Sequence, residues 1–267
     1  MTQANATGMK IWIQSGSGLA TDTTTPYGRR YEQSLARHLQ AVARPNTRLQ
    51  TFGIDATPFG KDRYHAAYHL VVSLMIKSVL RAEPQGYDAI AVVNTFDHGY
   101  YELREIVDLP VVFITESTLY LACQLAPTFA FVTHNQAMLL HVTELAKRYG
   151  IAARMIRGQH LNLTYDDFPR MYDDPAPYLA AFRKAAQQVI ARGATIILVA
   201  GNPVNMFLLD QGVRDIDGTP ILDCCGAVVK TAELMVDLHR LGIRRSRKGL
   251  FTAPSAEEKV ELHKLYE

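Results

Sequence analysis

The chain has 267 residues, of which 48% are hydrophobic and 20% are charged, and its formal net charge at pH 7 is +2. These values are ordinary for a globular protein, and so small a net charge favours neither a nucleic acid nor a membrane as a partner. Three cysteines are too few for a disulfide framework, and the N-terminus lacks the apolar core of a signal peptide. We therefore expect a soluble protein of the cytoplasm.

Apolar segments of strand length alternate with amphipathic segments of helical length along the whole chain. The predicted strands cover residues 9–14, 48–54, 89–93, 109–114, 129–133, a weaker 153–156, 194–200 and 220–223. The predicted helices cover residues 26–43, 62–81, 101–107, 116–126, 135–149, 178–192, 206–213 and 226–241. This alternation predicts an α/β protein with a mainly parallel sheet, or with two such sheets.

Two of the predicted strands end in similar polar loops. Strand 89–93 is followed by the loop 94–99 (NTFDHG), and strand 194–200 is followed by the loop 201–205 (GNPVN). Open α/β folds place ligand sites where parallel strands end, and the N–H groups of the following helix suit an anionic ligand. The recurrence of this corner predicts two facing lobes with a cleft between them.

The order of the elements and three segments resemble the aspartate/glutamate/hydantoin racemase superfamily, and the hydantoin racemase branch most closely. The segments are 87–105, 125–135 with 145–154 after it, and 219–234. The resemblance implies two similar lobes with mainly parallel sheets flanked by helices, a pseudo-twofold axis, and an active site in the cleft between the lobes. It also implies a homo-oligomer that uses no cofactor and no metal. We place lobe one at residues 1–115 plus 222–267 and lobe two at residues 116–221.

In that family two cysteines face each other across the cleft and exchange a proton next to a carboxylate or carbonyl group. In this chain the first of these positions falls at Asn94 or Thr95, and the second falls near Ala200, Gly201 or Asn202. Asparagine does not exchange a proton at neutral pH, so these residues exclude racemisation by two cysteines. We therefore expect a retained scaffold with changed chemistry.

We predict His98, Asp97 and Glu116 as the catalytic residues. Histidine has a reference pKa near ~6.5 and suits a general acid or base, and Asp97 would orient His98. The alternative is that Asp97 caps the following helix and that His98 packs at the start of that helix. Glu116 is either a buried base or an acidic residue in the first turn of a helix.

Other polar side chains at the ends of strands are candidates for substrate binding. Such groups can hold a carboxylate or stabilise an oxyanion, or they can serve only to cap the local turn. The candidates are Gln14, Asn94, Thr95, Ser117, Thr133, His134, Asn202 and Asn205, with the role of Thr133 implied by the resemblance. Cys224 and Cys225 are either a displaced nucleophile or small buried apolar groups.

These residues predict a cofactor-independent enzyme that acts on a small carboxylate or amide-type substrate. Hydrolysis of a C–N bond is the first choice, because an Asn-lined oxyanion site and a histidine base need no further group. Decarboxylation or another lyase reaction is the neighbouring possibility. Two alternatives stay open: a racemase or isomerase that uses bases other than cysteine, and a small-molecule binder without catalysis.

Overall fold

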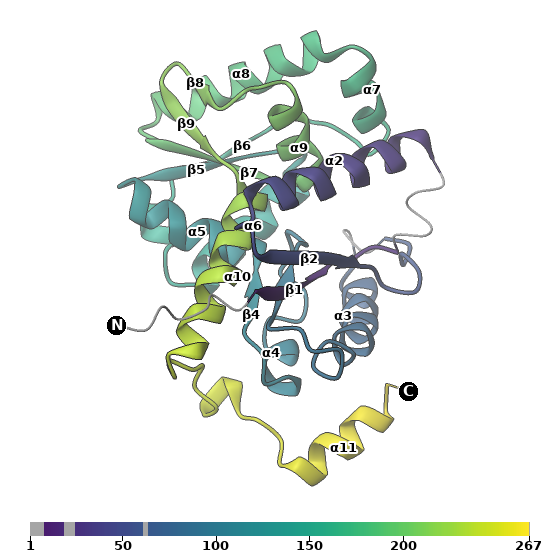
Figure 1. The fold of residues 1–267 in the computed structure, drawn as a ribbon. Helices are drawn as coiled ribbons and strands as arrows, with labels where there is room; N and C mark the ends of the chain where they lie inside the picture. The colour runs from purple at the N-terminus through teal and green to yellow at the C-terminus, as the bar shows by residue number, and fades with distance from the viewer. Residues whose placement is uncertain (1–7, 19–24, 61–63, 267) are drawn as a thin grey trace.

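The computed structural model describes residues 8–18, 25–60 and 64–266. These residues form two sheets, and helices flank each of them (Figure 1). Every pairing but one is parallel, so the predicted α/β class with parallel-dominated sheets is confirmed. The predicted start of the helix over 62–81 lies outside the described residues.

The first sheet has the strand order β2-β1-β3-β4. Its strands are β2 (Thr47–Phe52), β1 (Met9–Gln14), β3 (Ala89–Val92) and β4 (Val111–Phe113), and the neighbouring helices are α2 (Pro26–Val42), α3 (His65–Val79) and α4 (Glu102–Ile106). Ile11 and Ile13 pack into a core with α2, whereas Trp12 between them packs into a core with α3. Both faces of the central part of the sheet are therefore buried, which explains the unbroken apolar sequences of β3 (AIAV) and β4 (VVF).

The second sheet has the strand order β6-β5-β7-β9-β8, and only β8 is antiparallel to its neighbour. Its strands are β6 (Gln159–His160), β5 (Phe129–Thr133), β7 (Ile196–Ala200), β9 (Thr219–Leu222) and β8 (Asp215–Ile216), and its helices are α6 (Gln136–Arg148), α7 (Asp167–Asp173), α8 (Pro175–Ala191) and α9 (Asn202–Asp210). All five side chains of β5 and of β7 are buried. The loops that follow β5 and β7 are therefore attached to fully buried strands at the centre of the sheet.

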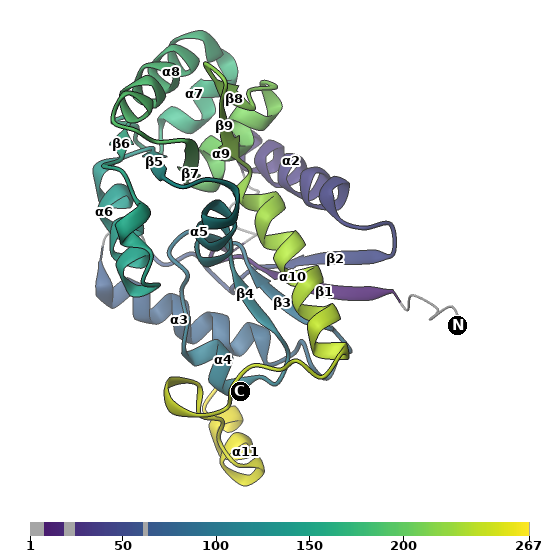
Figure 2. The ribbon, with the colours of Figure 1, turned by 90° about the vertical axis from the view of Figure 1, so that its left-hand side faces the viewer.

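Three helices join the two sheets. Helix α5 (Ile114–Leu125) leaves the first sheet and packs on β7 of the second, and α10 (Cys224–Arg240) packs on α5, β3 and β7 (Figure 2). Helix α2 follows β1 in the sequence, yet it packs on α9 and α10 (Figure 1). Side chains of α2 therefore reach the space between the sheets.

Several helices begin earlier than the sequence predicts. Helix α5 begins at Ile114 rather than at residue 116, and α9 begins at Asn202 rather than at residue 206. Pro203 is tolerated in the first turn of α9 because the N–H that proline lacks has no partner in a first turn. Pro175 begins α8 for the same reason. The corner after β7 is therefore a helix N-terminus rather than an extended loop.

The predicted strand over 153–156 is wrong. Residues Ala152–Arg154 form a short 3-10 helix, and Met155 contributes a single parallel bridge to Phe129 before β6 begins. Helix α7 lies in a stretch for which the sequence predicts neither a helix nor a strand. The 3-10 helix packs on α6, and α7 packs on α8 and α9; local sequence patterns do not reveal such tertiary contacts.

A cluster of basic residues near the C-terminus, within residues 240–248, would by its charge be expected to form a solvated loop, but side chains of this cluster are hydrogen-bonded to the end of α4 and the residues after it. Arg245 donates hydrogen bonds to the carbonyls of Val107 (2.8 Å) and Leu109 (3.1 Å), and Arg247 donates one to Val107 at 3.0 Å. The chain then forms a 3-10 turn at Gly249–Phe251 and helix α11 (Ala256–Lys264). No helix in the described ranges is both long enough and apolar enough to cross a membrane.

Candidate functional site

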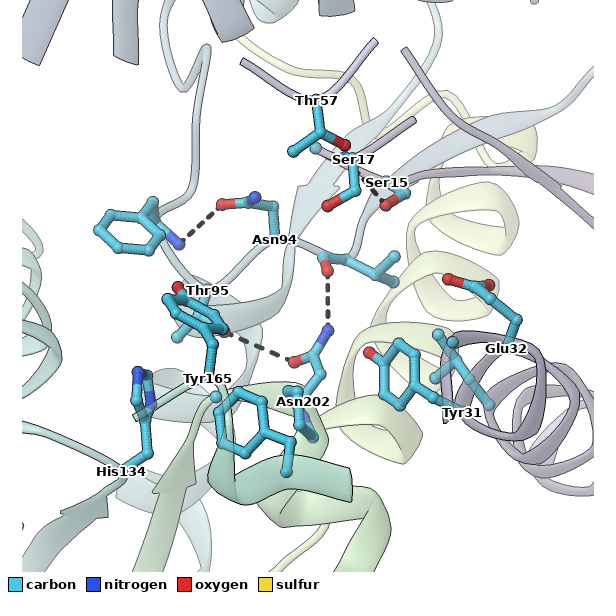
Figure 3. A pocket seen from close by; sticks show the side chains of 18 of the residues that line it. Ser15, Ser17, Tyr31, Glu32, Thr57, Asn94, Thr95, His134, Tyr165 and Asn202 are labelled. Carbon is cyan, nitrogen blue, oxygen red and sulfur yellow. Dashed lines mark hydrogen bonds between the residues drawn. The ribbon is translucent and has the colours of Figure 1, made fainter. Parts of the chain in front are cut away.

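A cavity of about 630 Å³ lies where strands of both sheets end. The segments after β1, β2 and β3 of the first sheet and after β5 and β7 of the second sheet line it, together with α2 (Figure 3). Parallel strands direct the side chains of their following loops to the same edge of a sheet, and pockets form at such edges. The cleft predicted between the sheets is therefore present as a cavity.

Asn94, directly after β3, presents its amide to this cavity. Its Oδ1 atom accepts hydrogen bonds from the N–H of Phe96 (3.0 Å) and from Nδ1 of His98 (2.7 Å). The Nδ2 atom lies against Gly16, where a Cβ atom would come within 2.2 Å of it. His98 and Gly16 together hold the amide with its N–H₂ group on the Gly16 side, and the amide nitrogen is the group available to a ligand.

Asn202, at the start of α9, ties the two corners together. Its Nδ2 atom donates a hydrogen bond to the carbonyl of Val93 (2.8 Å), and its Oδ1 atom accepts one from Oγ1 of Thr95 (3.5 Å) (Figure 3). These contacts join the end of β3 in the first sheet to the end of β7 in the second. The two predicted corner loops therefore meet in the structure.

His134 occupies the side of the cavity formed by the second sheet. It follows β5, is 3% exposed, and packs against the rings of Tyr165 (6.0 Å between centroids) and Phe168 (5.5 Å). Gly201 has a φ of 106°, and a Cβ atom built on it would lie 2.9 Å from Nδ1 of His134. The imidazole thus fills the space in which a side chain at residue 201 would begin.

Asp97 and His98 do not line the cavity, and both are 0% exposed. The carboxylate of Asp97 accepts hydrogen bonds from the N–H groups of Thr115 (3.0 Å) and Glu116 (2.9 Å) and from Oη of Tyr149 (2.7 Å). Burial raises the pKa of Asp97 to about 7, although these three hydrogen bonds oppose the rise. Asp97 therefore caps a helix, as the alternative interpretation held, but the helix is α5 rather than the one that follows Asp97.

Glu116 also lies outside the cavity lining. It forms an ion pair with Arg104 at 2.6 Å and accepts a hydrogen bond from Oη of Tyr100 at 2.8 Å. Arg104 in turn lies over the ring of Tyr100, 4.3 Å from its centroid. These contacts give Glu116 a role in packing α5 against α4.

The predicted substrate-binding residues divide into two groups. Asn94, Thr95, His134 and Asn202 line the cavity, whereas Gln14, Ser117, Thr133 and Asn205 do not. Thr133 donates a hydrogen bond to the carbonyl of Asn135 (2.8 Å), and Asn205 donates one to Oδ1 of Asp223 (3.2 Å). The residues outside the cavity therefore hold local structure around it.

The sequence interpretation missed the contributions of α2 and of the residues that close the cavity. Nothing in the local sequence shows that α2, which carries Tyr31, crosses to the second sheet. The additional polar and aromatic lining residues are Ser15, Ser17, Thr25, Tyr27, Tyr31, Glu32, Thr51, Thr57, Phe59, Phe96, Tyr165 and Phe168. Ser15 and Ser17 belong to the polar segment SGSG that directly follows β1, and this position after a strand is a sequence signal that could have found them.

None of the three cysteines lines the cavity. Cys224 and Cys225 begin α10 and are buried, and Cys123 lies in α5. A hydrogen bond with the Cys224 thiol and burial raise the pKa of Cys225 well above its usual value. The thiolate is the reactive form of cysteine, so a thiol with a raised pKa is a poor nucleophile. The interpretation of Cys225 as a small buried apolar group therefore fits better.

Comparison with known proteins identifies the scaffold. The model of the Asp/Glu/Hydantoin racemase family matches residues 23–232. The chain belongs to this family. It is 27% identical over 221 residues to a hydantoin racemase of Pseudomonas sp. (strain NS671), covering 83% of this chain and 86% of that protein.

Solved structures of the family share the fold. An allantoin racemase from Klebsiella pneumoniae has a TM-score of 0.75 at 19% identity, covering 93% of this chain and 94% of that one. An allantoin racemase from Pseudomonas fluorescens has a TM-score of 0.72 at 23% identity, covering 92% of this chain and 97% of that one. At these identities the likeness concerns the arrangement of the elements, and the chemistry has to be argued from the cavity itself.

Proposed function

We propose that this chain is an isomerase that exchanges the proton on a carbon next to a carbonyl group of a small cyclic amide, with His134 in place of a cysteine thiol. The contact between Gly201 and His134 carries this proposal. The family resemblance puts the second thiol at or beside residue 201, and here the imidazole fills the place where a side chain at 201 would begin. The names of the related proteins support racemisation rather than the hydrolysis that the sequence suggested first.

The proposal assigns the proton transfer to two groups on opposite sides of Asn202. His134 lies on one side and Tyr31 on the other, and Tyr31 reaches in from α2 (Figure 3). Histidine is the side chain that most readily takes up and releases a proton near neutral pH. Burial holds the pKa of Tyr31 well above its usual value, so its hydroxyl stays protonated and can act as a proton donor.

An amide group would stabilise the charge that forms during the transfer. When His134 removes the proton, negative charge develops on the carbonyl oxygen of the substrate. The N–H₂ group of Asn94 lines the same cavity and can donate a hydrogen bond to that oxygen, while Thr95 and Asn202 hold the two corners together beside it. A proton from Tyr31 on the opposite face completes the inversion, after which Tyr31 regains a proton and His134 releases one to solvent.

Hydrolysis with His98 and Asp97 as the acid–base pair has less support. Both side chains are fully buried. His98 donates a hydrogen bond to the amide oxygen of Asn94, and Asp97 accepts one from the N–H of Thr115 in the first turn of α5. A general base has to lie within hydrogen-bond reach of the proton that it removes. His98 would therefore act by orienting Asn94, and we propose it as a positioning residue.

The optical rotation of a single-enantiomer hydantoin with an alkyl chain on its ring tests the reaction class. We expect the optical rotation to decay to zero, and we expect mass spectrometry to show that the hydantoin ring stays intact. His134→Asn should slow this decay at least about 100-fold, because a general acid–base group contributes a factor of this order. His69→Asn, an exposed histidine outside the cavity, is the control. If the native protein opened the hydantoin ring as fast as the optical rotation decays, the proposal would be wrong and hydrolysis would be supported.

A further inference from the structure

Residues 244–266 form a C-terminal arm at the end of the molecule that lies away from the second sheet (Figure 1). The arm contains the 3-10 turn and α11, and none of its residues lines the cavity. Lys259 of α11 forms ion pairs with Glu83 (3.2 Å) and Asp108 (3.1 Å) of the first lobe. Any effect of the arm on the cavity therefore has to pass through the residues that the arm contacts.

Two arginines of the arm hold the C-terminal end of α4, the helix that follows the 94–99 corner. Arg245 donates a hydrogen bond to the carbonyl of Val107 (2.8 Å), and Arg247 donates one to the carbonyl of Arg104 (3.2 Å). The last carbonyls of a helix have no partner within the helix, and cationic donors at this end also complement its dipole. The arm therefore fixes the end of a helix that has only five residues.

Phe251 of the arm completes an aromatic enclosure around the guanidinium of Arg104. The distances from this guanidinium to the three ring centroids are 4.3 Å for Tyr100, 4.8 Å for Phe113 and 5.4 Å for Phe251. Arg104 is 7% exposed, and the attraction between a cation and an aromatic face is larger where water is excluded. Phe251 therefore restrains the guanidinium from the side of the arm.

A continuous series of polar contacts leads from Arg104 to the cavity. Nη2 of Arg104 donates a hydrogen bond to Oε2 of Glu116 (2.6 Å), and the N–H of Glu116 donates one to the carboxylate of Asp97 (2.9 Å). The N–H of Asp97 in turn donates a hydrogen bond to the carbonyl of Asn94 (2.9 Å). Networks of such contacts can transmit a displacement between distant sites. The series connects the arm with the residue whose amide lines the cavity.

We infer that Phe251 is a positioning residue that acts through Arg104 to hold the amide of Asn94 in place. The inference rests on the proposed function, in which this amide stabilises the charge that forms on the substrate in the transition state. A small displacement of such a donor weakens its hydrogen bond in the transition state, whereas the substrate keeps its other contacts. The arm therefore affects the chemical step more than the binding of the substrate.

Steady-state racemisation of an alkyl-substituted hydantoin by the full-length protein tests this role. Phe251→Ala should lower kcat about fivefold and leave KM unchanged, and Phe251→Tyr should restore the native kcat because it keeps the ring. Leu250→Ala is the matched control, since Leu250 is the neighbouring apolar residue of the arm and is 72% exposed. A kcat in Phe251→Ala that equals the kcat in Leu250→Ala would overturn the inference.

Amide hydrogen exchange, followed by NMR, measures the same effect without a substrate. Four N–H groups donate hydrogen bonds within this corner, and they belong to Phe96, Asp97, Thr115 and Glu116. We expect them to exchange about tenfold faster in Phe251→Ala than in the native protein, while the N–H groups of β5 and β7 keep their rates. Native rates at the corner, or an equal acceleration in β5 and β7, would show that Phe251 has no specific effect on the corner.

The two measurements allow the inference and the proposed function to fail separately. Faster exchange at the corner of Phe251→Ala, without racemisation by the native protein, would support the connection between the arm and the corner and refute the isomerase. Racemisation by the native protein, with native hydrogen exchange and native kcat in Phe251→Ala, would support the isomerase and refute the role of the arm.

Discussion

Two glycines decide how polar side chains enter the cavity. Gly16 makes room for the amide of Asn94, and Gly201 makes room for the imidazole of His134. In each case a Cβ atom would come closer than 3.0 Å to a nitrogen atom of the neighbouring side chain. The positions of Asn94 and His134 therefore each depend on the absence of a side chain at another residue.

Gly201→Ala tests this dependence for His134. Alanine at a φ of 106° is strained, and its Cβ atom would also push against Nδ1 of His134. We expect a loss of about 1–2 kcal/mol in the free energy of unfolding and a fall in the racemisation rate of about tenfold or more. Gly193→Ala is the control, because its φ is 101° but its Cβ atom would meet nothing within 4 Å. Gly193→Ala should lose stability and keep its activity; equal activity in the two variants would contradict the role of His134.

The imidazole of His98 is a second single-residue feature of the site, because its hydrogen bond to Oδ1 of Asn94 orients that amide. We expect His98→Phe to lower kcat about tenfold with little change in KM. Without the hydrogen bond from His98, the amide of Asn94 stays in the cavity but is no longer oriented toward the oxygen that becomes charged in the transition state. His98→Asn keeps an N–H donor near the same position and should recover part of that loss. Steady-state kinetics of racemisation provide the measurement. A fall in activity that is equal in both variants would indicate a direct proton-transfer role for His98 instead.

At the scale of single elements, the sequence predicted the central strands well because they are buried on both faces of their sheets, but it missed the short strands β6 and β8 at the edges of the second sheet. Strands β1 and β5 begin and end where the apolar runs do. The starts of α5 and α9 were missed for different reasons. The first turn of α5 is capped by Asp97, which lies 18 residues before Thr115, and a cap that is remote in sequence leaves no local signal. The start of α9 has Pro203 in its first turn, which a sequence pattern also allows in a loop.

The buried carboxylate of Asp97 makes stability depend on pH. Its pKa is raised from 3.8 to about 7 in the folded protein, so the folded state binds more protons than the unfolded state between these values. Its contribution to stability therefore falls as pH rises through that window. We expect the free energy of unfolding in urea to fall by about 2–3 kcal/mol more between pH 5 and pH 8 in the native protein than in Asp97→Asn.

Asp97→Asn also has a cost of its own, because asparagine has one acceptor oxygen for the two N–H groups of Thr115 and Glu116. The comparison of the two pH slopes is independent of that constant loss. Parallel slopes in the native protein and the variant would show that Asp97 has an ordinary pKa.

At the scale of the whole molecule, the cavity exists because α2 meets the ends of five strands, β1, β2, β3, β5 and β7, at one place. The sequence indicated the corners at Asn94 and Asn202, since polar residues follow apolar runs there. It did not indicate Tyr27, Tyr31 or Glu32, because α2 follows a strand of the first sheet and yet packs against α9 of the second. Such a crossing is fixed by tertiary contacts that no local pattern contains.

Ser34 holds this crossing in place and allows a test of it. Its hydroxyl lies 2.8 and 2.9 Å from the two carboxylate oxygens of Asp210 at the end of α9. We expect Ser34→Ala to lower the free energy of unfolding by about 1–2 kcal/mol and to raise KM, because Tyr31 and Glu32 shift with α2. Ser73→Ala, on the exposed face of α3, is the matched control. An unchanged KM in Ser34→Ala would show that α2 holds its place in the cavity without this contact.

The central claim is that a proton is exchanged beside a carbonyl group by His134 and without a thiol. Proton NMR of an alkyl-substituted hydantoin in deuterated water tests it most directly, because deuterium entering at the ring carbon reports proton removal alone. We predict exchange by the native protein, equal exchange after Cys123→Ser, Cys224→Ser and Cys225→Ser are combined in a folded variant, and a loss of at least about 100-fold in His134→Asn. Exchange that survives in His134→Asn, or that disappears in the folded cysteine-free variant, would contradict the claim.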